Sequence, residues 1–276
     1  MSAAADDAES FMALTEKMSR ERGFGTASYK DGCLRRRIAV RMRANRVDDY
    51  TAYSHLLDND PLEFDRLLDA LTINVTKLFR NNEVWDAVAA SVLQELWAGE
   101  SIRIQNWVAG CASGEEAYTL AALWHRHVKT HPASGAPDRV RITASDIDRR
   151  SLIAAAEGAF GPETLTETPD SIRGRYFASV DTDGRAHAAP ELREMIRFER
   201  RDLLSELPPA GALHLITCRN VIIYFDRPSQ EALMKRFHHA LAVGGFLVLG
   251  KVETLLGPSR LLFDVVDQRN RIFRRA

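Results

Sequence analysis

The sequence lacks a surplus of charge of either sign and has no paired cysteines. Its 37 basic and 38 acidic residues leave a formal net charge of −1, so a general nucleic-acid binder, which would be strongly basic, is not expected. The three cysteines, Cys33, Cys111 and Cys218, form no C-x-x-C pair and no Cys/His cluster. Neither a disulfide framework nor a zinc site is therefore expected.

Long apolar runs are also missing. No stretch approaches the roughly 20 apolar residues of a membrane-spanning helix. The first ten residues are acidic and lack the apolar core of a signal peptide. The chain has 276 residues, 45% of them hydrophobic, which is enough for one large or two modest domains with a real core. We therefore expect a globular protein of the cytoplasm that holds no metal ion.

The first quarter of the chain shows only helical periodicity. Residues 10–73 carry four apolar stripes at helical spacing, and Pro61 stands at a helix-start position. No strand pattern interrupts them. The sequence predicts a helical domain over residues 1–73, followed by a linker and a connecting helix over residues 74–101.

The second of these helices, predicted to start near Asp31, is unusually basic. Its basic residues stand against a single acid, Asp31, so acids at i±4 do not neutralise the run as a whole. A solvated helix face would explain such a run, but we favour a docking surface for an acidic partner. The arginines predicted to dock are Arg35, Arg36, Arg37, Arg41 and Arg43.

Strand-like and helix-like segments alternate from residue 102 onward. This alternation predicts a mostly parallel sheet with helices on both faces and a closing hairpin near the C-terminus. A D-T-D-G turn interrupts it and predicts a small antiparallel β-subdomain near residues 171–195. In parallel sheets ligands bind beyond the carboxyl ends of the strands. The residues that break the apolar pattern at those ends are Gly110, Asp146, Asp202 and Asn220.

The stretch I-Q-N-W-V-A-G-C-A-S-G-E-E-A-Y-T-L (104–120) reads as a strand, a tight turn and a helix start. Its small residues would let a ligand approach the backbone, with Ser113 as N-cap and Glu116 as its capping-box partner. Gly110 and Gly114 do not match the G-x-G-x-x-G spacing of dinucleotide sites. Two carboxylates would repel a pyrophosphate but suit a cationic ligand such as S-adenosylmethionine. An ordinary βα turn capped by glutamates explains this loop equally well.

Polar residues after the next strands suit the remaining parts of a nucleoside. Asp146 is placed to accept hydrogen bonds from ribose hydroxyls. It could instead cap the following helix, a role that Asp148 could also fill. Asp202 and Leu203 could border an adenine. Residues 219–224 lie where a reacting group would be.

Five motifs in this order resemble those of the CheR-type chemotaxis receptor methyltransferases. They are N-V-T-K-L-F-R-N (74–81), G-C-A-S-G-E-E-A-Y (110–118), A-S-D-I-D (144–148), C-R-N-V-I-I-Y-F-D (218–226) and G-K-V-E (250–253). The resemblance covers nearly the whole chain. It implies an α/β fold: a Rossmann-like methyltransferase domain over residues 102–276 with an inserted β-subdomain, after the helical N-terminal domain. The implied reaction is S-adenosylmethionine-dependent methylation of receptor glutamates.

The resemblance also implies roles for single residues. Arg80 and Tyr224 would lie by the transferred methyl group, and the basic helix would face the receptor's cytoplasmic helical domain, so that the membrane is met only through the receptor. Whether Glu116 shares the contact of Glu115 stays open. The residues that would contact the cofactor are Asn74, Thr76, Arg80, Gly110, Glu115, Asp146, Asp202, Leu203, Arg219 and Asn220.

The chain departs from the family pattern in a few places. Leu78 replaces one of two phenylalanines, Asp202 replaces an asparagine, and Lys251 and Val252 replace the middle of G-H-S-E. These departures motivate an alternative: a methyltransferase-like module that binds cofactor or partners without methylating receptors. Methylation of nucleic acid draws only on the arginine helix and lacks stacking aromatics, so it ranks last.

Overall fold

A computed structural model describes residues 3–71, 76–99, 101–131 and 137–276. It divides the chain into two compact units. One comprises Met1–Ile73 and Tyr224–Ser229, and the other comprises Asn74–Ile223 and Gln230–Ala276. Within the described residues, no helix has the length and apolar character needed to span a bilayer.

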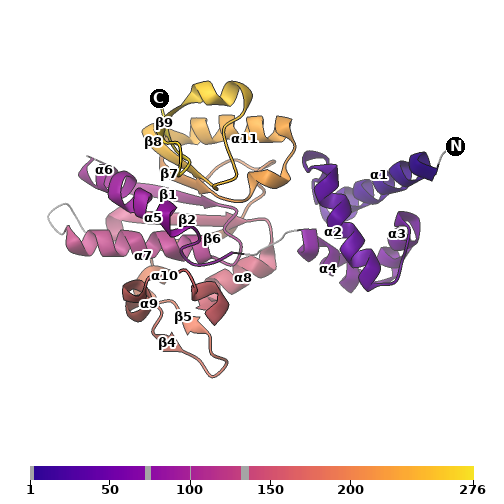
Figure 1. Cartoon of the computed structure of the whole chain (residues 1–276), viewed down its shortest axis with the longest axis horizontal. Helices are drawn as coiled ribbons and strands as arrows, with labels where there is room; N and C mark the ends of the chain where they lie inside the picture. Colours follow the sequence, from indigo (N-terminus) through magenta and orange to yellow (C-terminus); the bar gives the residue numbers. More distant parts are fainter. Residues whose placement is uncertain (1–2, 72–75, 100, 132–136) are drawn as a thin grey trace. The chain divides into compact units, whose positions relative to one another are not determined.

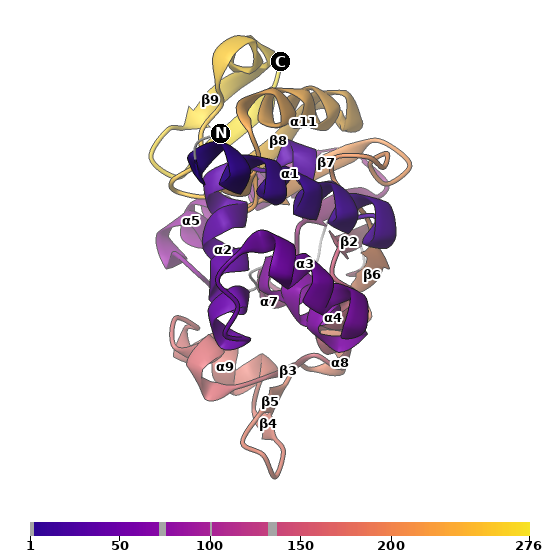
Figure 2. The same cartoon turned by 90° about the vertical axis from the view of Figure 1, so that its right-hand side faces the viewer.

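The smaller unit is built from four helices, which Figure 2 shows in full. They are α1 (Ala3–Arg22), α2 (Asp31–Ala44), α3 (Tyr50–Asn59) and α4 (Pro61–Leu71), with a 3-10 turn at Thr26–Ser28. Asp49 caps α3 by accepting the Ala52 N–H at 2.7 Å, and Pro61 begins α4 as predicted. Leu14, Ile38 and Tyr53 are fully buried in its core. The predicted all-helical N-terminal part is therefore confirmed.

The larger unit is organised around a seven-stranded sheet. The five strands β6, β2, β1, β7 and β8 lie side by side in parallel, and β10 runs antiparallel between β8 and β9. The closing hairpin is thus confirmed. The strands are β1 (Ile104–Ala109), β2 (Val140–Asp146), β6 (Ile196–Arg200), β7 (Leu213–Cys218), β8 (Leu241–Leu249), β9 (Phe263–Asp267) and β10 (Ile272–Arg275).

Helices cover both faces of this sheet. In Figure 1 the sheet lies between α11 on one side and α7 on the other. Adjacent residues of β1 show why, because successive side chains of a strand point to opposite faces. Asn106 accepts a hydrogen bond from the Trp124 indole of α7 at 3.0 Å, whereas Trp107 packs edge-on against Phe237 of α11 at 5.4 Å. The helices are α5 (Asn82–Ala87), α6 (Leu93–Ala98), α7 (Glu115–Thr130), α8 (Arg149–Glu157) and α11 (Arg227–Ala240).

A small lobe is inserted between α8 and β6. It lies on the side of α7 away from the sheet (Figure 1) and contains a three-stranded antiparallel sheet in the order β3-β5-β4. The predicted β-subdomain is confirmed, although its first strand comes earlier than residue 171. Its elements are β3 (Ala159–Phe160), a 3-10 turn (Pro162–Leu165), α9 (Asp170–Tyr176), β4 (Ser179–Val180), β5 (Ala186–His187) and α10 (Pro190–Arg193).

The strand order reverses between β1 and β7. From β1 the chain proceeds to β2 and β6 on one side, and then returns to β7 and β8 on the other. In open α/β sheets such a switch point leaves a crevice at the carboxyl ends of the strands, where ligands bind. The turns after β1 and β7 follow the carboxyl ends of the two strands at this switch point, so a ligand is expected beside them.

Candidate functional site

The turn after β1 is shaped by two glycines with left-handed backbones. Gly110 has φ +79° and Gly114 has φ +95°. A Cβ on Gly110 would lie 2.5 Å from a methyl carbon of Val221, and one on Gly114 would lie 3.0 Å from the Ala155 Cβ. Glycine is therefore required by the backbone and by neighbouring protein atoms. Protein atoms fill the positions that a Cβ would take at these two residues, and the approach of a ligand to this loop stays a prediction.

The predicted capping box between Ser113 and Glu116 is wrong. Gly114 occupies the N-cap position of α7 and makes no side-chain cap. The Ser113 hydroxyl instead lies 2.9 Å from both carboxylate oxygens of Glu115. The left-handed glycine moves the helix start by one residue, which the residue types alone did not reveal.

Three carboxylates gather at this turn. Glu115 is 3% exposed and Asp146 is 9% exposed, and burial raises the pKa of each. Burial also raises the pKa of Glu116, against the opposing effect of the Arg219 cation. Burial is the largest cause of the raised pKa of the Cys111 thiol, and the negative charges of Asp146, Glu116 and Glu115 raise that pKa further. All three carboxylates therefore lie close enough to influence Cys111. The turn therefore carries a concentrated negative field.

One of these carboxylates has an unused oxygen. Within the described chain, Glu116 Oε1 is buried without a hydrogen bond of standard geometry, although the Thr217 side chain is close enough to lower the pKa of this carboxyl group. A buried carboxylate oxygen without a partner is costly, and a cation or N–H donor placed there would offset that cost. The site thus fits the cationic methionine end of S-adenosylmethionine. No group of three or more metal-type ligands occurs in the described segments.

Asp146 joins the turns after β1 and β2. Its Oδ2 accepts the Ala112 N–H at 2.8 Å, and its Oδ1 accepts the Asp148 N–H at 3.0 Å. Asp148 is the N-cap of α8 and accepts the Arg150 N–H at 2.9 Å. Of the two predicted alternatives, the helix cap is therefore Asp148, which leaves Asp146 at the mouth of the crevice.

The turn after β7 is held by a buried glutamate to which the sequence gave no role. Glu253, 3% exposed, accepts the backbone N–H groups of Asn220 at 2.8 Å and Gly250 at 2.7 Å. Asn220 has φ +61°, a conformation that needs such support. Of the family departures in this motif, Lys251 pairs with Glu83 at 2.5 Å and Val252 is exposed.

Arg80 lies in a short loop, residues 76–81, with an unusual backbone. Both of its neighbours, Phe79 (φ +58°) and Asn81 (φ +61°), are left-handed. The Phe79 N–H donates to the Thr119 hydroxyl of α7 at 2.9 Å, and the Asn81 N–H donates to Glu167 Oε2 of the lobe at 2.8 Å. Several outside contacts thus fix a conformation that the loop would not adopt by itself. Thr119 and Glu167 carried no signal in the sequence, because their partners lie far along the chain.

Arg219 connects the turn after β7 to this loop. Its side chain is 2% exposed and stacks on Trp85, with 4.9 Å between the guanidinium carbon and the ring centroid. Nη2 donates to the Arg80 carbonyl at 2.8 Å and to Asn81 Oδ1 at 3.2 Å. Nη1 lies 3.4 Å from Glu116 Oε2. The sequence placed Arg219 by the cofactor, and the structure brings it together with Arg80 and Glu116.

The predicted adenine-side residues form a tight turn after β6. Asp202 Oδ1 accepts the Leu204 N–H at 2.9 Å, and Oδ2 accepts the Ser205 hydroxyl at 2.7 Å. Leu203 is 7% exposed. Thr76 is half-buried at the start of the Arg80 loop, and the predicted cofactor residue Asn74 lies outside the described residues.

Tyr224 belongs to the smaller unit. Its carbonyl accepts the Lys30 N–H at 3.0 Å, and the neighbouring Phe225 forms an antiparallel bridge with Tyr29. The Arg37 guanidinium carbon lies 4.4 Å from the Tyr224 ring centroid. Arg37 is 6% exposed and donates to the Leu71 carbonyl, so the predicted docking role does not fit Arg37.

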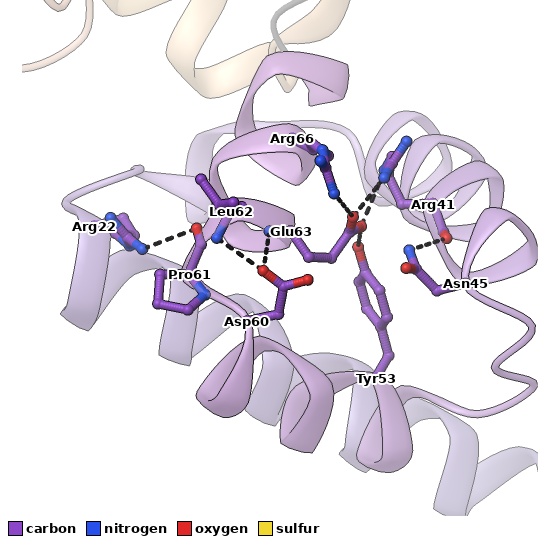
Figure 3. A network of polar contacts seen from close by, with 9 residues as sticks. All are labelled: Arg22, Arg41, Asn45, Tyr53, Asp60, Pro61, Leu62, Glu63 and Arg66. Carbon is purple, nitrogen blue, oxygen red and sulfur yellow. Dashed lines mark hydrogen bonds and ion pairs between the residues drawn. The ribbon is translucent and has the colours of Figure 1, made fainter.

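The other α2 arginines divide into bonded and exposed sets. Figure 3 shows Arg41 paired through two nitrogens with the fully buried Glu63, at 3.0 and 2.5 Å, while the Tyr53 hydroxyl donates to Glu63 at 2.7 Å. Burial alone would raise the pKa of Glu63, but these hydrogen bonds hold it below its usual value. Arg35 pairs with Asp7 of α1 at 2.8 Å. Acids on other helices therefore neutralise Arg41 and Arg35, which the lack of matching acids at i±4 within α2 did not reveal.

The remaining two predicted docking arginines, Arg36 and Arg43, are exposed. Docking stays a prediction for these two residues and for the half-buried Arg35 and Arg41.

The sheet order and the acidic turn at its switch point fit a methyltransferase that uses S-adenosylmethionine. Models of the CheR methyltransferase family match nearly the whole chain: the all-alpha domain at residues 9–72 and the SAM binding domain at residues 74–272. The chain belongs to the CheR methyltransferase family, and its cofactor is S-adenosylmethionine.

Curated relatives agree with this assignment. A chemotaxis protein methyltransferase of Listeria monocytogenes is 31% identical over 90% of this chain and 91% of its own length. Chemotaxis protein methyltransferase 2 of Pseudomonas aeruginosa is 32% identical over 93% of this chain and 90% of its own. An uncharacterized 104.1 kDa protein of Rhodobacter capsulatus is 34% identical over 98% of this chain, which spans only 28% of that protein.

Proposed function

We propose that this chain methylates glutamate side chains of chemotaxis receptors, giving glutamyl methyl esters during signal adaptation. The structural observation that carries the proposal is the cluster of three desolvated carboxylates at the switch point, with Glu116 Oε1 left without a partner. The substrate class is supported by the names of the relatives from Listeria monocytogenes and Pseudomonas aeruginosa. These names favour a receptor methyltransferase over the alternative of a non-catalytic module.

The cofactor supplies a methyl group on a positively charged sulfur. Glu115 and Glu116 would offset the charge of its methionine end, and Asp146 keeps free lone pairs for ribose hydroxyls. The residues proposed to hold it are Asn74, Thr76, Arg80, Gly110, Glu115, Asp146, Asp202, Leu203 and Asn220, and Arg219 is proposed to lie near its reactive end.

A glutamate substrate needs no general base. Its carboxyl group has an ordinary pKa of about 4.3 and is ionised at neutral pH. Bound S-adenosylmethionine would supply a methyl group for in-line attack by a carboxylate oxygen, with the electron pair of the C–S bond left on sulfur. Arg80 would steer the carboxylate, and Tyr224 would orient the methyl group. Catalysis then consists of positioning and exclusion of water.

Competing nucleophiles near the turn are suppressed. Burial is the main reason that the pKa values of Cys111 and Cys218 lie well above the usual thiol value, and the negative charges of nearby acids raise them further. Both thiols therefore stay protonated at neutral pH, and the thiolate is the reactive form.

The proposal is tested by two measurements on the wild-type chain. Calorimetry with S-adenosylhomocysteine should show one site per chain. Tritiated S-adenosylmethionine should then label membranes that carry the host's receptors, and the label should be released by mild base, as for a methyl ester. Cofactor binding with no base-labile label on any receptor would support the non-catalytic module instead.

A further inference from the structure

The terminal nitrogens of Arg219 are held by protein groups, whereas its buried Nε has no hydrogen-bond partner among the described residues. Its two terminal nitrogens contact the Arg80 carbonyl, Asn81 Oδ1 and Glu116 Oε2, and its planar face lies on Trp85. Only 2% of the side chain is exposed. A guanidinium in this state has little surface left for a cofactor, so its chemistry is directed at the Arg80 loop.

Arg219 contacts the Arg80 loop where two residues have left-handed backbones. The carbonyl of Arg80 belongs to the peptide that joins Arg80 to the left-handed Asn81, and the left-handed Phe79 precedes Arg80. Non-glycine residues in this conformation persist only where the surroundings hold them. Thr119 and Glu167 hold the two N–H groups that flank Arg80, and Arg219 holds its carbonyl.

Charge explains why Glu116 belongs to the same assembly. Burial lowers the pKa of Arg219, the nearby Arg80 cation lowers it further, and Glu116 opposes both effects. Two arginine cations this close repel each other unless a carboxylate lies between them. Glu116 supplies that carboxylate with Oε2, while its Oε1 remains available.

We infer that Arg219, with Glu116 as its counter-ion, is a positioning residue that sets the backbone of Arg80 for methyl transfer. We call Arg219, Glu116 and the Arg80–Asn81 peptide the Arg80 brace. The inference rests on the proposed function. It assigns the Arg219 side chain to the support of Arg80, whereas the sequence assigned it to the cofactor. Arg219 acts on the reaction through Arg80 and touches no reacting atom.

The variant that tests the brace is Arg219→Lys. Lysine keeps the charge but, as a single ammonium on a flexible stem, does not reproduce the planar fork that reaches Glu116 and the Arg80 carbonyl together. We expect the affinity for S-adenosylhomocysteine to stay within about threefold, while kcat falls roughly 10- to 100-fold, as misplaced catalytic groups do. A parallel loss of cofactor affinity and kcat would overturn the inference, and so would an unchanged kcat.

Arg139 offers a matched control. Like Arg219, it donates to backbone carbonyls, those of Ser101 at 2.8 Å and Trp97 at 3.0 Å, and stacks on a tryptophan ring at 4.7 Å. It lies just before β2, at the opposite end of the strands. Arg139→Lys should lower thermal stability without changing kcat, which separates positioning of Arg80 from general support of the fold.

A second readout does not depend on methyl transfer. In Arg219→Lys, hydrogen exchange at the Phe79 and Asn81 amides should become at least tenfold faster, while the Arg139→Lys chain should match wild type there. Unchanged exchange at these amides would refute the brace even if receptors were labelled normally. Faster exchange in a chain that labels no receptor would leave the brace standing and reject the proposed function.

Discussion

The two ends of the parallel sheet are built on different principles. At the amino end, Arg139 donates to backbone carbonyls, and His214 receives the Gln105 N–H at 3.1 Å and contacts Ser101 at 3.0 Å. At the carboxyl end, buried carboxylates, a buried arginine and several left-handed residues crowd together. Hydrogen bonds between neutral and cationic protein groups hold the amino end, whereas the carboxyl end keeps strain and buried charge that a ligand and substrate would relieve. This asymmetry locates the site without reference to any relative.

The largest expected effect is at Arg80. Arg80→Ala removes the group proposed to steer the substrate carboxylate, so methyl transfer should fall by about two orders of magnitude or more, with unfolding unchanged. The exposed Arg103, just before β1, supplies a control at the amino end: Arg103→Ala should transfer at the wild-type rate. Near-normal turnover of Arg80→Ala would show that Arg80 does not steer the substrate. It would also weaken the contrast between the two ends of the sheet.

A second effect concerns pH. Burial raises the pKa of Glu115, Glu116 and Asp146 in the folded chain, so each takes up a proton at higher pH than in the unfolded chain. Their contribution to folding stability is therefore greatest below the unfolded pKa and is lost as pH rises through the folded pKa. Cofactor affinity should move the other way and weaken on acidification through the raised pKa values, because neutral carboxyls no longer attract a cation.

Calorimetry with S-adenosylhomocysteine between pH 5 and 8 measures this trend. Glu115→Gln should bind about tenfold more weakly at pH 8 and show a flatter pH profile than wild type. An affinity that is independent of pH in both chains would mean that the acidic cluster does not hold the cofactor's ammonium group.

A third, smaller effect compares two left-handed glycines. A Cβ on Gly110, at the carboxyl end, meets the packed Val221 at 2.5 Å, whereas one on Gly211, before β7, meets the flexible amide end of Gln105 at 2.8 Å. Gly110→Ala should cost roughly 2–4 kcal/mol of unfolding free energy, from backbone strain and overpacking together. Gly211→Ala should cost only about 1–2 kcal/mol, since Gln105 can move aside. Denaturant titration of both variants measures these losses of unfolding free energy. Equal losses for Gly110→Ala and Gly211→Ala would contradict the prediction.

The smallest effect is expected at Lys251, where the chain departs from its family. Lys251 pairs with Glu83, but both side chains are partly exposed, at 29% and 48%. Such pairs contribute about 0.2–1 kcal/mol. Lys251→His, which restores the family residue, should change the melting temperature by only a few degrees and leave kcat within twofold. A large loss of activity would show that this position takes part in the site.

The sequence predicted the four helices, the mostly parallel sheet and the inserted lobe, because each depends on local periodicity and turn chemistry. It also placed Asp146 and Gly110 at strand ends. It missed Thr119, Glu167 and Glu253, whose roles arise from hydrogen bonds to residues 30 to 86 positions away. For the same reason it could not tell buried Arg37 from exposed Arg36.

The helix cap was missed for a different reason. Ser113 and Glu116 match a capping box by residue type, but the φ of Gly114 decides where α7 begins. Such a backbone choice depends on the packing of Gly114 against Ala155 in α8, which local residue types do not report.

The contacts of Glu167 and Thr164 limit how the inserted lobe can be exchanged between relatives. Glu167 binds Asn81 and Asn82, and the Thr164 carbonyl accepts the Leu78 N–H at 3.0 Å, so the first turns of the insertion also form one wall of the Arg80 loop. The hairpin from residue 178 to 188 makes none of these contacts among the described bonds and can vary in length or chemistry. A chimaera that transplants the whole insertion would also replace that wall, and one that cuts after Glu167 would keep it.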